Sequence, residues 1–580
     1  MAARRARQRS ASRRLLALLV CSMVGFTVIS ARLVALQVVD SSNLAAAAAG
    51  QRLRKVELPA GRGRIFDRNG RDLALSVDAR TVYAQPPLVA DPRRTAARLA
   101  PLLKIGRGEL AAKLGGDAPF VYLARKVRPV VGARVARLRL AGVGVLDDSR
   151  RTYPDGRLAA QVLGFVGTDG DGLAGLELHY ESLLQGRAGW TLLEQDPRGR
   201  PIPRGRRHVQ PPVPGSDVVT TLDAPLQFKA EDALARAVRR HHAHGGSIVV
   251  LSPTGGEVLA MANLPAFDPN GFARSKPAQR RNRAVVDAFE PGSTNKTITA
   301  AAALEAGVVT PRTRLRVPDQ LRLCPNKTFH DAHRHGLETI PFSRVVAESS
   351  NVGTIRVAQR LGARRLAAAA AAFGYGRPTG IDFPGESPGL VTPVERWRCT
   401  DLGVNAIGQG VAVTVLQMAS VYATVANGGV LVEPSLVRGV VDPWGRYRDL
   451  PPTPARRVVS EKTARDLTRI LTGVVKEGGT GTEAAIGGYQ VAGKTGTARV
   501  PDTRKGGYIP GAYIASFIGF APADRARDGV VVAVVLDRPT PIYGGLVAAP
   551  TFREVASFAM QRLGLAPRGH RRPAGEGGGR

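Results

Sequence analysis

Residues 291–296 read Pro291-Gly292-Ser293-Thr294-Asn295-Lys296, and the Ala-rich run Thr297–Leu304 follows them directly. The run predicts a helix, which places Ser293 in its first turn. At the i, i+3 spacing a Lys296 amine is within reach of the Ser293 hydroxyl, and backbone N–H groups at a helix start stabilise a developing oxyanion. A Ser-x-x-Lys sequence arises by chance about once or twice in a chain this long, so the stretch needs support from elsewhere.

Two further short motifs follow in the chain, Ser349-Ser350-Asn351 and Lys494-Thr495-Gly496-Thr497. A serine hydroxyl needs a nearby base, and a lysine can serve as one when burial lowers its pKa, whereas an arginine cannot. Only 12 of the 82 basic residues are Lys, yet positions 296 and 494 both are. In the third motif Gly496 lets a substrate lie close to the backbone, and the Lys and Thr side chains suit a carboxylate. Together the motifs indicate serine acyl-transfer chemistry.

The apolar pattern around the motifs predicts an antiparallel sheet flanked by helices. Ala224–Arg239 carries its apolar residues on one helical face. Ser247–Leu251 and Val258–Ala262 are typical of a hairpin. Later segments of the pattern are a helix around Leu467–Val474, strands at Ile514–Phe520 and Val530–Leu536, and a last helix at Phe552–Leu563. This order predicts an α+β fold with an all-α portion inserted between the strands.

The first 36 residues predict a single transmembrane anchor. Residues 1–14 include six arginines, and the apolar run Leu15–Ala31 continues beyond Arg32 to Leu36. This length suits a tilted spanning helix, and the arginines predict a cytoplasmic N-terminus. A cleaved signal peptide is the alternative, although the small residues Ala45–Ala49 lie far from the apolar run. We expect a single-pass protein of the plasma membrane whose catalytic part is extracytoplasmic.

Length and composition divide the chain into regions. A chain of 580 residues exceeds one ordinary core. The Pro-rich stretches Arg198–Pro203 and Pro211–Gly215 indicate a domain boundary, and the C-terminal end lacks apolar periodicity. The predicted regions are a basic cytoplasmic tail at 1–14, an anchor at 15–36, a non-catalytic domain at 37–215, a catalytic domain at 216–565 and a disordered tail at 566–580.

Charge and cysteine content exclude some function classes. The formal net charge is +35, but the arginines are scattered and are not interleaved with aromatic residues, so we expect no nucleic-acid partner. A surface that faces anionic polymers or lipid headgroups also fits this charge. Cys324 and Cys399 are free to pair outside the cytoplasm, and the sequence leaves this pairing open. The segment His330–His335 holds three histidines and an aspartate, but their spacing matches no standard metal site. We expect no metal and no cofactor.

The three ordered motifs resemble those of the class B penicillin-binding proteins, which are monofunctional peptidoglycan D,D-transpeptidases. The resemblance runs from the anchor to about residue 565. Further segments that resemble the family are Arg62–Gly70, Gly175–Glu177 before Gly186, Gly374–Gly376 and Ile407–Gly410. The family implies a bitopic anchor, an elongated pedestal of the dimerisation type and a penicillin-recognising serine-enzyme domain, which is the β-lactamase and transpeptidase fold.

The resemblance also implies a reaction and a role for each motif. Ser293 attacks the D-Ala–D-Ala bond of a donor stem peptide, D-Ala leaves, and an amine of a neighbouring stem attacks the acyl-enzyme. Lys296 is the acylation base, Ser349 relays the proton to the leaving amine, and Asn351 positions Lys296 and the substrate. Backbone N–H groups of the first and third motifs form the oxyanion hole, and β-lactams acylate the same serine. The substrate-binding residues, which hold the terminal carboxylate, are Lys494, Thr495, Gly496 and Thr497.

Within the class, the FtsI type that acts in septal synthesis during division fits better than the elongation type. The segments that carry this choice are Ser350–Gly353, Ala515–Pro522 and Tyr543–Gly545. The resemblance implies an FtsW-type membrane glycosyltransferase and other division proteins as partners, because no glycosyltransferase domain is apparent in the chain. The alternatives are a β-lactam-binding sensor, a catalytically silent division scaffold, and a D,D-carboxypeptidase or β-lactamase.

Overall fold

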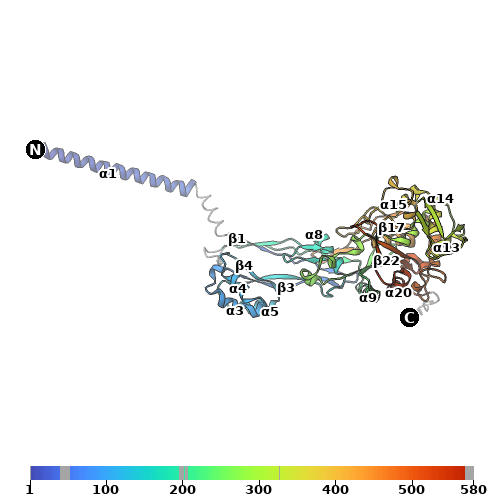
Figure 1. Cartoon of the computed structure of the whole chain (residues 1–580). Helices are drawn as coiled ribbons and strands as arrows, with labels where there is room; N and C mark the ends of the chain where they lie inside the picture. Colours follow the sequence, from blue (N-terminus) through green and yellow to red (C-terminus); the bar gives the residue numbers. More distant parts are fainter. Residues whose placement is uncertain (1, 40–52, 195–201, 203–206, 326, 568–580) are drawn as a thin grey trace, which may run out of the picture. The chain divides into compact units, whose positions relative to one another are not determined.

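The computed structural model describes residues 2–39, 53–194, 202, 207–325 and 327–567. Figure 1 shows the whole chain. Internal contacts divide it into two units. One unit comprises Met1–Gly61 and Gly186–Pro214, and the other comprises Arg62–Gln185 and Gly215–Arg580. The small residues at 45–49, the Pro-rich stretch at 198–201 and 203, and the predicted disordered tail beyond residue 567 all lie outside the described residues.

The first unit contains the predicted membrane anchor. Helix α1 (Ala2–Val34) continues into a π-helical turn, η1 (Ala35–Val39). The stretch Arg13–Val38 is long and apolar enough to cross a membrane, and it contains the predicted anchor at 15–36. The same unit holds a three-stranded antiparallel sheet in the order β1 (Leu53–Leu58), β8 (Gly189–Glu194) and β9 (Arg207–Gln210).

The second unit begins with a seven-stranded sheet built around the long strand β3 (Asp72–Ala84). A turn at Asn69-Gly70 joins β2 (Ile65–Phe66) to β3 as an antiparallel pair, with Gly70 at φ 84°, where glycine adopts the left-handed region without penalty. The other strands are β4 (Val121–Val127), β5 (Val143–Thr152), β10 (Asp217–Thr220), β18 (Val437–Val441) and β19 (Tyr447–Asp449). This sheet therefore joins strands from both sides of the predicted boundary at 215/216, which stays a prediction.

Helices pack on the strands at one end of this sheet around a small core of their own. The helices are α3 (Pro92–Leu103), α4 (Arg107–Leu114) and α5 (Pro129–Arg137). Leu99 and Leu110 are fully buried there against Val82 of β3 and Leu123 of β4. Short elements then lead towards the catalytic part: α6 (Ala160–Leu163), β6 (Phe165–Val166), β7 (Gly172–Ala174), α7 (Gly175–His179) and α8 (Glu181–Leu184).

The catalytic part is built on a five-stranded antiparallel sheet between two helical layers (Figure 1). The strand order is β12 (Val258–Leu264), β11 (Gly245–Leu251), β23 (Val530–Asp537), β22 (Tyr508–Ala521) and β21 (Ala492–Pro501). Successive side chains of a strand point to opposite faces. Accordingly, Ile248 and Val250 pack in one core with helices α9 (Ala224–Arg240) and α20 (Ala549–Arg562), while Val249 and Leu251 pack in the other core. The predicted sheet and its flanking helices are confirmed.

The second core is covered by the helices that the sequence places between the strands. They are α12 (Lys296–Glu305), α13 (Phe342–Ala347), α14 (Asn351–Leu361), α15 (Ala363–Ala372), α16 (Asp401–Ala406), α17 (Val415–Ala426) and α18 (Glu461–Gly473). The portion predicted as all-α also carries short antiparallel pairs, namely β13 (Arg314–Val317) with β16 (Glu338–Pro341), β14 (Gln320–Cys324) with β15 (Lys327–His330), and β17 (Val430–Val432) with β20 (Ala455–Arg457). A disulfide joins Cys324 to Cys399, which answers the pairing that the sequence left open.

Candidate active site

Ser293 lies in a 3-10 turn, η4 (Gly292–Asn295), that runs directly into α12, in agreement with its predicted place at a helix start. Its neighbours Thr294 and Asn295 are buried, whereas Ser293 is partly exposed. The Gly292 N–H donates to the Gly408 carbonyl at 2.9 Å, and the Tyr422 hydroxyl donates to the Thr294 carbonyl at 3.0 Å. These bonds hold the turn while leaving the Ser293 side chain accessible.

Lys296 is fully buried and belongs to the second motif as much as to the first. Its Nζ donates to the Ser349 carbonyl at 2.6 Å, to Asn351 Oδ1 at 2.7 Å and to Ser349 Oγ at 3.2 Å. The sequence predicted a contact from Lys296 to the Ser293 hydroxyl, but within the described part of the chain that hydroxyl forms no hydrogen bond. The amine is drawn to the second motif because a buried donor needs acceptors.

Burial changes the acid–base character of Lys296. Removal from water lowers the pKa of its ammonium to about 7, and the nearby Asp331 carboxylate offsets part of that fall. An amine with a pKa near neutrality is present in appreciable amount without its proton, which is the form that accepts a proton from a hydroxyl. The structure therefore gives Lys296 the acid–base property that the sequence argument required.

The second motif is held in an unusual backbone conformation. Ser349 has φ 61°, a left-handed value that is uncommon for residues with a side chain. Directly after it, the Ser350 hydroxyl caps α14 by accepting the Gly353 N–H at 2.8 Å. Asn351 Nδ2 donates to the His330 carbonyl at 2.8 Å. Ser349 and Asn351 are thereby fixed on the side of Lys296.

Asp331 anchors this arrangement, a role that its sequence neighbourhood did not indicate. Its carboxylate accepts the Ser350 hydroxyl at 2.8 Å and the Val352 N–H at 3.0 Å. His335 Nε2 lies 3.1 Å from the same carboxylate; burial lowers the pKa of His335, but the bonds to Asp331 and a carbonyl raise it overall. The His/Asp segment considered above as a metal site thus contains a carboxylate that orders the second motif.

The third motif lies within β21, at the edge of the sheet. This strand begins at Ala492 and contains all four motif residues. Lys494 is fully buried, and burial together with the charge of Lys296 holds its pKa well below the ordinary value. The charge of Lys296 therefore acts on Lys494.

Glycines allow β21 to approach the Ser293 turn. A Cβ atom at Gly496 would lie 2.3 Å from Ser516 Oγ and 3.0 Å from Thr294 Cγ2, and one at Gly292 would lie 3.1 Å from the Thr497 carbonyl oxygen. Protein atoms therefore occupy the space beside Gly496 that the sequence argument assigned to a substrate. Thr495 Oγ1 lies 2.7 Å from the Thr480 hydroxyl, and Thr497 Oγ1 accepts the Gly544 N–H at 3.4 Å. All three motifs meet at one place.

Glu290 is a second residue that the motifs did not reveal. It is buried, and its Oε1 accepts the Gly410 N–H at 2.8 Å, while the Tyr508 hydroxyl donates to its Oε2 at 3.1 Å. Burial raises the pKa of Glu290. This carboxylate ties the hairpin between β21 and β22 to the segment just before Ser293, over a separation of 218 residues that no local sequence pattern reports.

Two family models together match most of the chain. The family model "Penicillin binding protein transpeptidase domain" matches residues 246–557, and "Penicillin-binding Protein dimerisation domain" matches residues 57–220. The chain belongs to the class B penicillin-binding proteins. Within this family it is 37% identical to penicillin-binding protein PbpB of Mycobacterium tuberculosis, covering 93% of this chain and 83% of that protein. It is 32% identical to peptidoglycan D,D-transpeptidase FtsI of Escherichia coli, and the match covers 94% of this chain and 91% of that protein.

Solved structures of class B penicillin-binding proteins share the fold. Penicillin binding protein 3 from Mycobacterium tuberculosis, complexed with aztreonam, superposes with a TM-score of 0.71 at 34% identity, covering 88% of this chain and 98% of the solved one. That relative was crystallised with a β-lactam, which agrees with the penicillin-binding class indicated by the motifs.

Proposed function

We propose that this chain is a peptidoglycan D,D-transpeptidase that cross-links stem peptides through a Ser293 acyl-enzyme, and that β-lactams acylate the same serine. The observation that carries the proposal is the placement of a partly exposed Ser293 one turn before a fully buried Lys296 whose pKa is about 7. Relatives over nearly the whole length, named as D,D-transpeptidases, support the reaction class.

In the first half-step Ser293 Oγ attacks the carbonyl carbon of the donor D-Ala–D-Ala bond, and its proton passes to the neutral Lys296 amine. Backbone N–H groups of Ser293 and Thr497 stabilise the oxyanion. The proton then moves through Ser349 to the departing amine, so that D-Ala leaves as a neutral-amine product and an ester remains on Ser293. The hydrogen bonds of Lys296 to both atoms of Ser349 support this relay.

In the second half-step the amine of a neighbouring stem attacks the ester carbonyl. It loses a proton to the same relay, a new amide bond forms, and the Ser293 hydroxyl is regenerated with that proton. Asn351 holds Lys296 through its Oδ1 in both half-steps. The reaction exchanges one amide for another and needs neither an oxidant nor a cofactor.

The third motif holds the terminal carboxylate of the donor through Lys494, Thr495 and Thr497, while Gly496 lets the strand lie against the Ser293 turn. Lys494 lies in a site whose burial and neighbouring lysine both disfavour its charged form. A substrate carboxylate supplies the opposite charge and returns Lys494 to the ammonium form. Binding and protonation are therefore coupled.

We further propose that the protein acts in septal synthesis, anchored in the plasma membrane with a cytoplasmic N-terminus and an extracytoplasmic catalytic part. The apolar helix at Arg13–Val38 and the arginines that precede it support this orientation. The FtsI and PbpB relatives support the class. A membrane glycosyltransferase of the FtsW type is the proposed partner, and the elongation role is the alternative.

Labelling of the full chain with a fluorescent penicillin tests the proposal. Wild type and an exposed-serine control, Ser149→Ala, should label equally, and Ser293→Ala should not label. If the wild-type chain is not labelled by the fluorescent penicillin, the acyl-enzyme proposal is wrong and a catalytically silent scaffold is favoured. Rapid loss of the label would favour a hydrolase, and stable labelling without cross-linking of stem peptides would favour a sensor.

A further inference from the structure

A second cavity of about 600 Å³, to which none of the three motifs contributes, lies between the end of β5 and a 3-10 turn, η3 (Pro269–Arg274). Asn270 of η3 holds the two walls together, because its Oδ1 accepts the Tyr153 N–H at 3.0 Å and its Nδ2 donates to the Tyr153 carbonyl at 3.0 Å. Phe272 stacks on Phe165 at a centroid distance of 4.5 Å and closes one side. The cavity is therefore built from fixed walls rather than from loose surface loops.

The charged residues that line this cavity are all cations: Arg125, Lys126, Arg150 and Arg151. Among the described lining residues there is no Asp or Glu. Arg125 and Arg151 have carboxylate partners in Asp169 and Glu177, each at 2.6 Å. Arg150 and Lys126 form no ion pair in the described part of the chain, so a negative group that enters the cavity is attracted to them.

Arg151 supplies an independent sign of a missing partner. Only 4% of its side chain is exposed, and two of its nitrogens are satisfied by Glu177 Oε1 at 2.6 Å and by the Gly63 carbonyl at 2.7 Å. Its remaining nitrogen, Nη2, has no hydrogen-bond partner among the described residues. Buried guanidinium nitrogens are nearly always paired, so this one marks a place where a further acceptor belongs.

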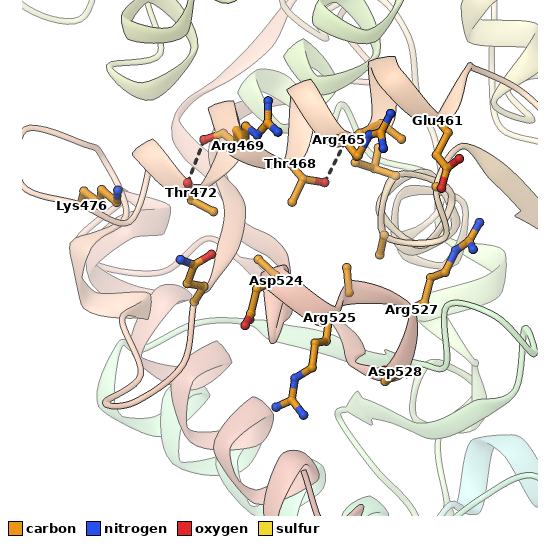
Figure 2. Close-up of a pocket in the computed structure, with 17 residues that line it drawn as sticks. Glu461, Arg465, Thr468, Arg469, Thr472, Lys476, Asp524, Arg525, Arg527 and Asp528 are labelled. Carbon is orange, nitrogen blue, oxygen red and sulfur yellow. Dashed lines mark hydrogen bonds between the residues drawn. The ribbon is translucent and has the colours of Figure 1, made fainter. Parts of the chain in front are cut away.

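The larger cavity of about 830 Å³ shown in Figure 2 lacks these features. It lies between α18 and the 3-10 turn η7 (Ala523–Asp528), and Figure 2 shows Arg465 and Arg469 on α18 across from Arg527 and Asp528 on η7. Three carboxylates share its lining with the cations, namely Glu461, Asp524 and Asp528. Mixed charge of this kind is ordinary for a solvated surface, whereas the charge around the smaller cavity has a single sign.

We propose that the cavity at Arg125, Lys126, Arg150 and Arg151 binds an oxyanion with two or more negative charges, of the phosphate or carboxylate class. Guanidinium groups bind such anions through paired charge-assisted hydrogen bonds. The side chains of Arg150 and Lys126 meet the anion from the cavity wall. The buried guanidinium of Arg151 adds positive charge behind that wall. None of the three motifs contributes a residue to the lining of this cavity, so the proposal is separate from the proposed transpeptidation.

Lys126 makes anion binding at this site depend on pH. The backbone of Lys126 has φ 53°, and the Lys126 N–H donates to the Thr81 hydroxyl at 3.2 Å. Burial and the neighbouring Arg125 and Arg62 lower the pKa of Lys126, while Asp148 and Asp169 partly offset the fall. A bound anion favours the ammonium form, so binding takes up a proton at alkaline pH and weakens as pH rises through that pKa.

Calorimetric titration of the full chain in detergent with inorganic pyrophosphate, and separately with tricarballylate, tests the site. Sodium chloride at matched ionic strength controls for screening. Arg150→Gln and Lys126→Gln should each weaken binding by about tenfold, the effect of losing one charge-assisted bond. Arg134→Gln is the matched control, because Arg134 is an exposed arginine on α5 that does not line the cavity.

The site is supported if both cavity variants bind the anion more weakly while Arg134→Gln keeps the wild-type affinity. The thermal unfolding midpoints of all three variants should stay unchanged. Binding of pyrophosphate alone identifies a phosphate site, and binding of tricarballylate alone a carboxylate site. No heat above the sodium chloride control in wild type overturns the proposal, as does equal weakening in Arg134→Gln. Retained penicillin labelling in Arg150→Gln would show that this test is independent of the Ser293 assignment.

Discussion

Acylation of Ser293 by a penicillin is expected to accelerate as pH rises, with a midpoint near 7. Lys296 must accept a proton, so only its neutral form is active. With a pKa of about 7, roughly 9% of the amine is neutral at pH 6 and roughly 91% at pH 8, which gives an increase of about tenfold between them. The same lysine in water, with a pKa of 10.5, would give a rate that still rose tenfold per pH unit at pH 9.

The structure also fixes how the midpoint should move. The Asp331 carboxylate favours the ammonium form of Lys296, so Asp331→Asn should lower the midpoint. The fall of the Lys296 pKa from 10.5 to about 7 corresponds to about 5 kcal/mol against the charged amine. Burial causes this fall, and Asp331 only opposes it, so the variant should keep a sigmoidal profile.

The assay is the initial rate of labelling of the full chain by a fluorescent penicillin in buffers from pH 5 to pH 9 at constant ionic strength. Asp147→Asn, which removes an exposed carboxylate of β5, is the matched control and should keep the wild-type midpoint. A rate that is independent of pH, or a midpoint near 10, would refute the assignment of Lys296 as the base. A midpoint that rises in Asp331→Asn would refute the electrostatic reasoning.

Three other perturbations give clear expectations. Glu177→Ala leaves buried Arg151 without its carboxylate and Arg62 with Glu181 alone, and it should lower the free energy of unfolding by about 3–5 kcal/mol, measured by urea titration; a change below about 1 kcal/mol would contradict that network. Thiol titration of the denatured full chain should find Cys21 alone without reductant, and Cys324 and Cys399 in addition after reduction; three thiols before reduction would exclude the disulfide. Tyr508→Phe loses its hydrogen bonds to the carboxylate before the Ser293 turn and should slow penicillin acylation several-fold, whereas an unchanged rate would show that this tie does not order the site.

Local pattern predicted much of the catalytic part. The unbroken apolar run Ile248–Leu251 indicates burial on both faces of one strand, because neighbouring side chains enter different cores. The Ala-rich run after Ser293 predicts its helix since few other conformations suit it. The motif residues could be chosen from chemistry alone, because only a few side-chain types serve as nucleophile and adaptable base.

Contacts between distant residues could not be predicted in this way. Asp331 orders the second motif by bonds to Ser350 and Val352, yet in the sequence it stood out only through nearby histidines. Glu290 meets Tyr508 across 218 residues. The Lys296 amine was expected at Ser293, but a long flexible side chain takes whichever acceptors the fold provides, and the fold provided Ser349 and Asn351. The tertiary structure determines these hydrogen-bond partners, and the periodicity of the sequence does not predict them.

The position of β21 at the sheet edge has a consequence for selectivity. In the described part of the chain β21 pairs only with β22, so its outer backbone N–H and C=O groups are able to pair with an extended peptide. A substrate taken up as an added strand is recognised by main-chain shape, and its side chains contribute little. An inhibitor that copies this shape is hard to evade by exchanging a β21 side chain, because the bonds come from the backbone. Escape must then bend the strand or hinder entry, and either change also penalises the natural peptide.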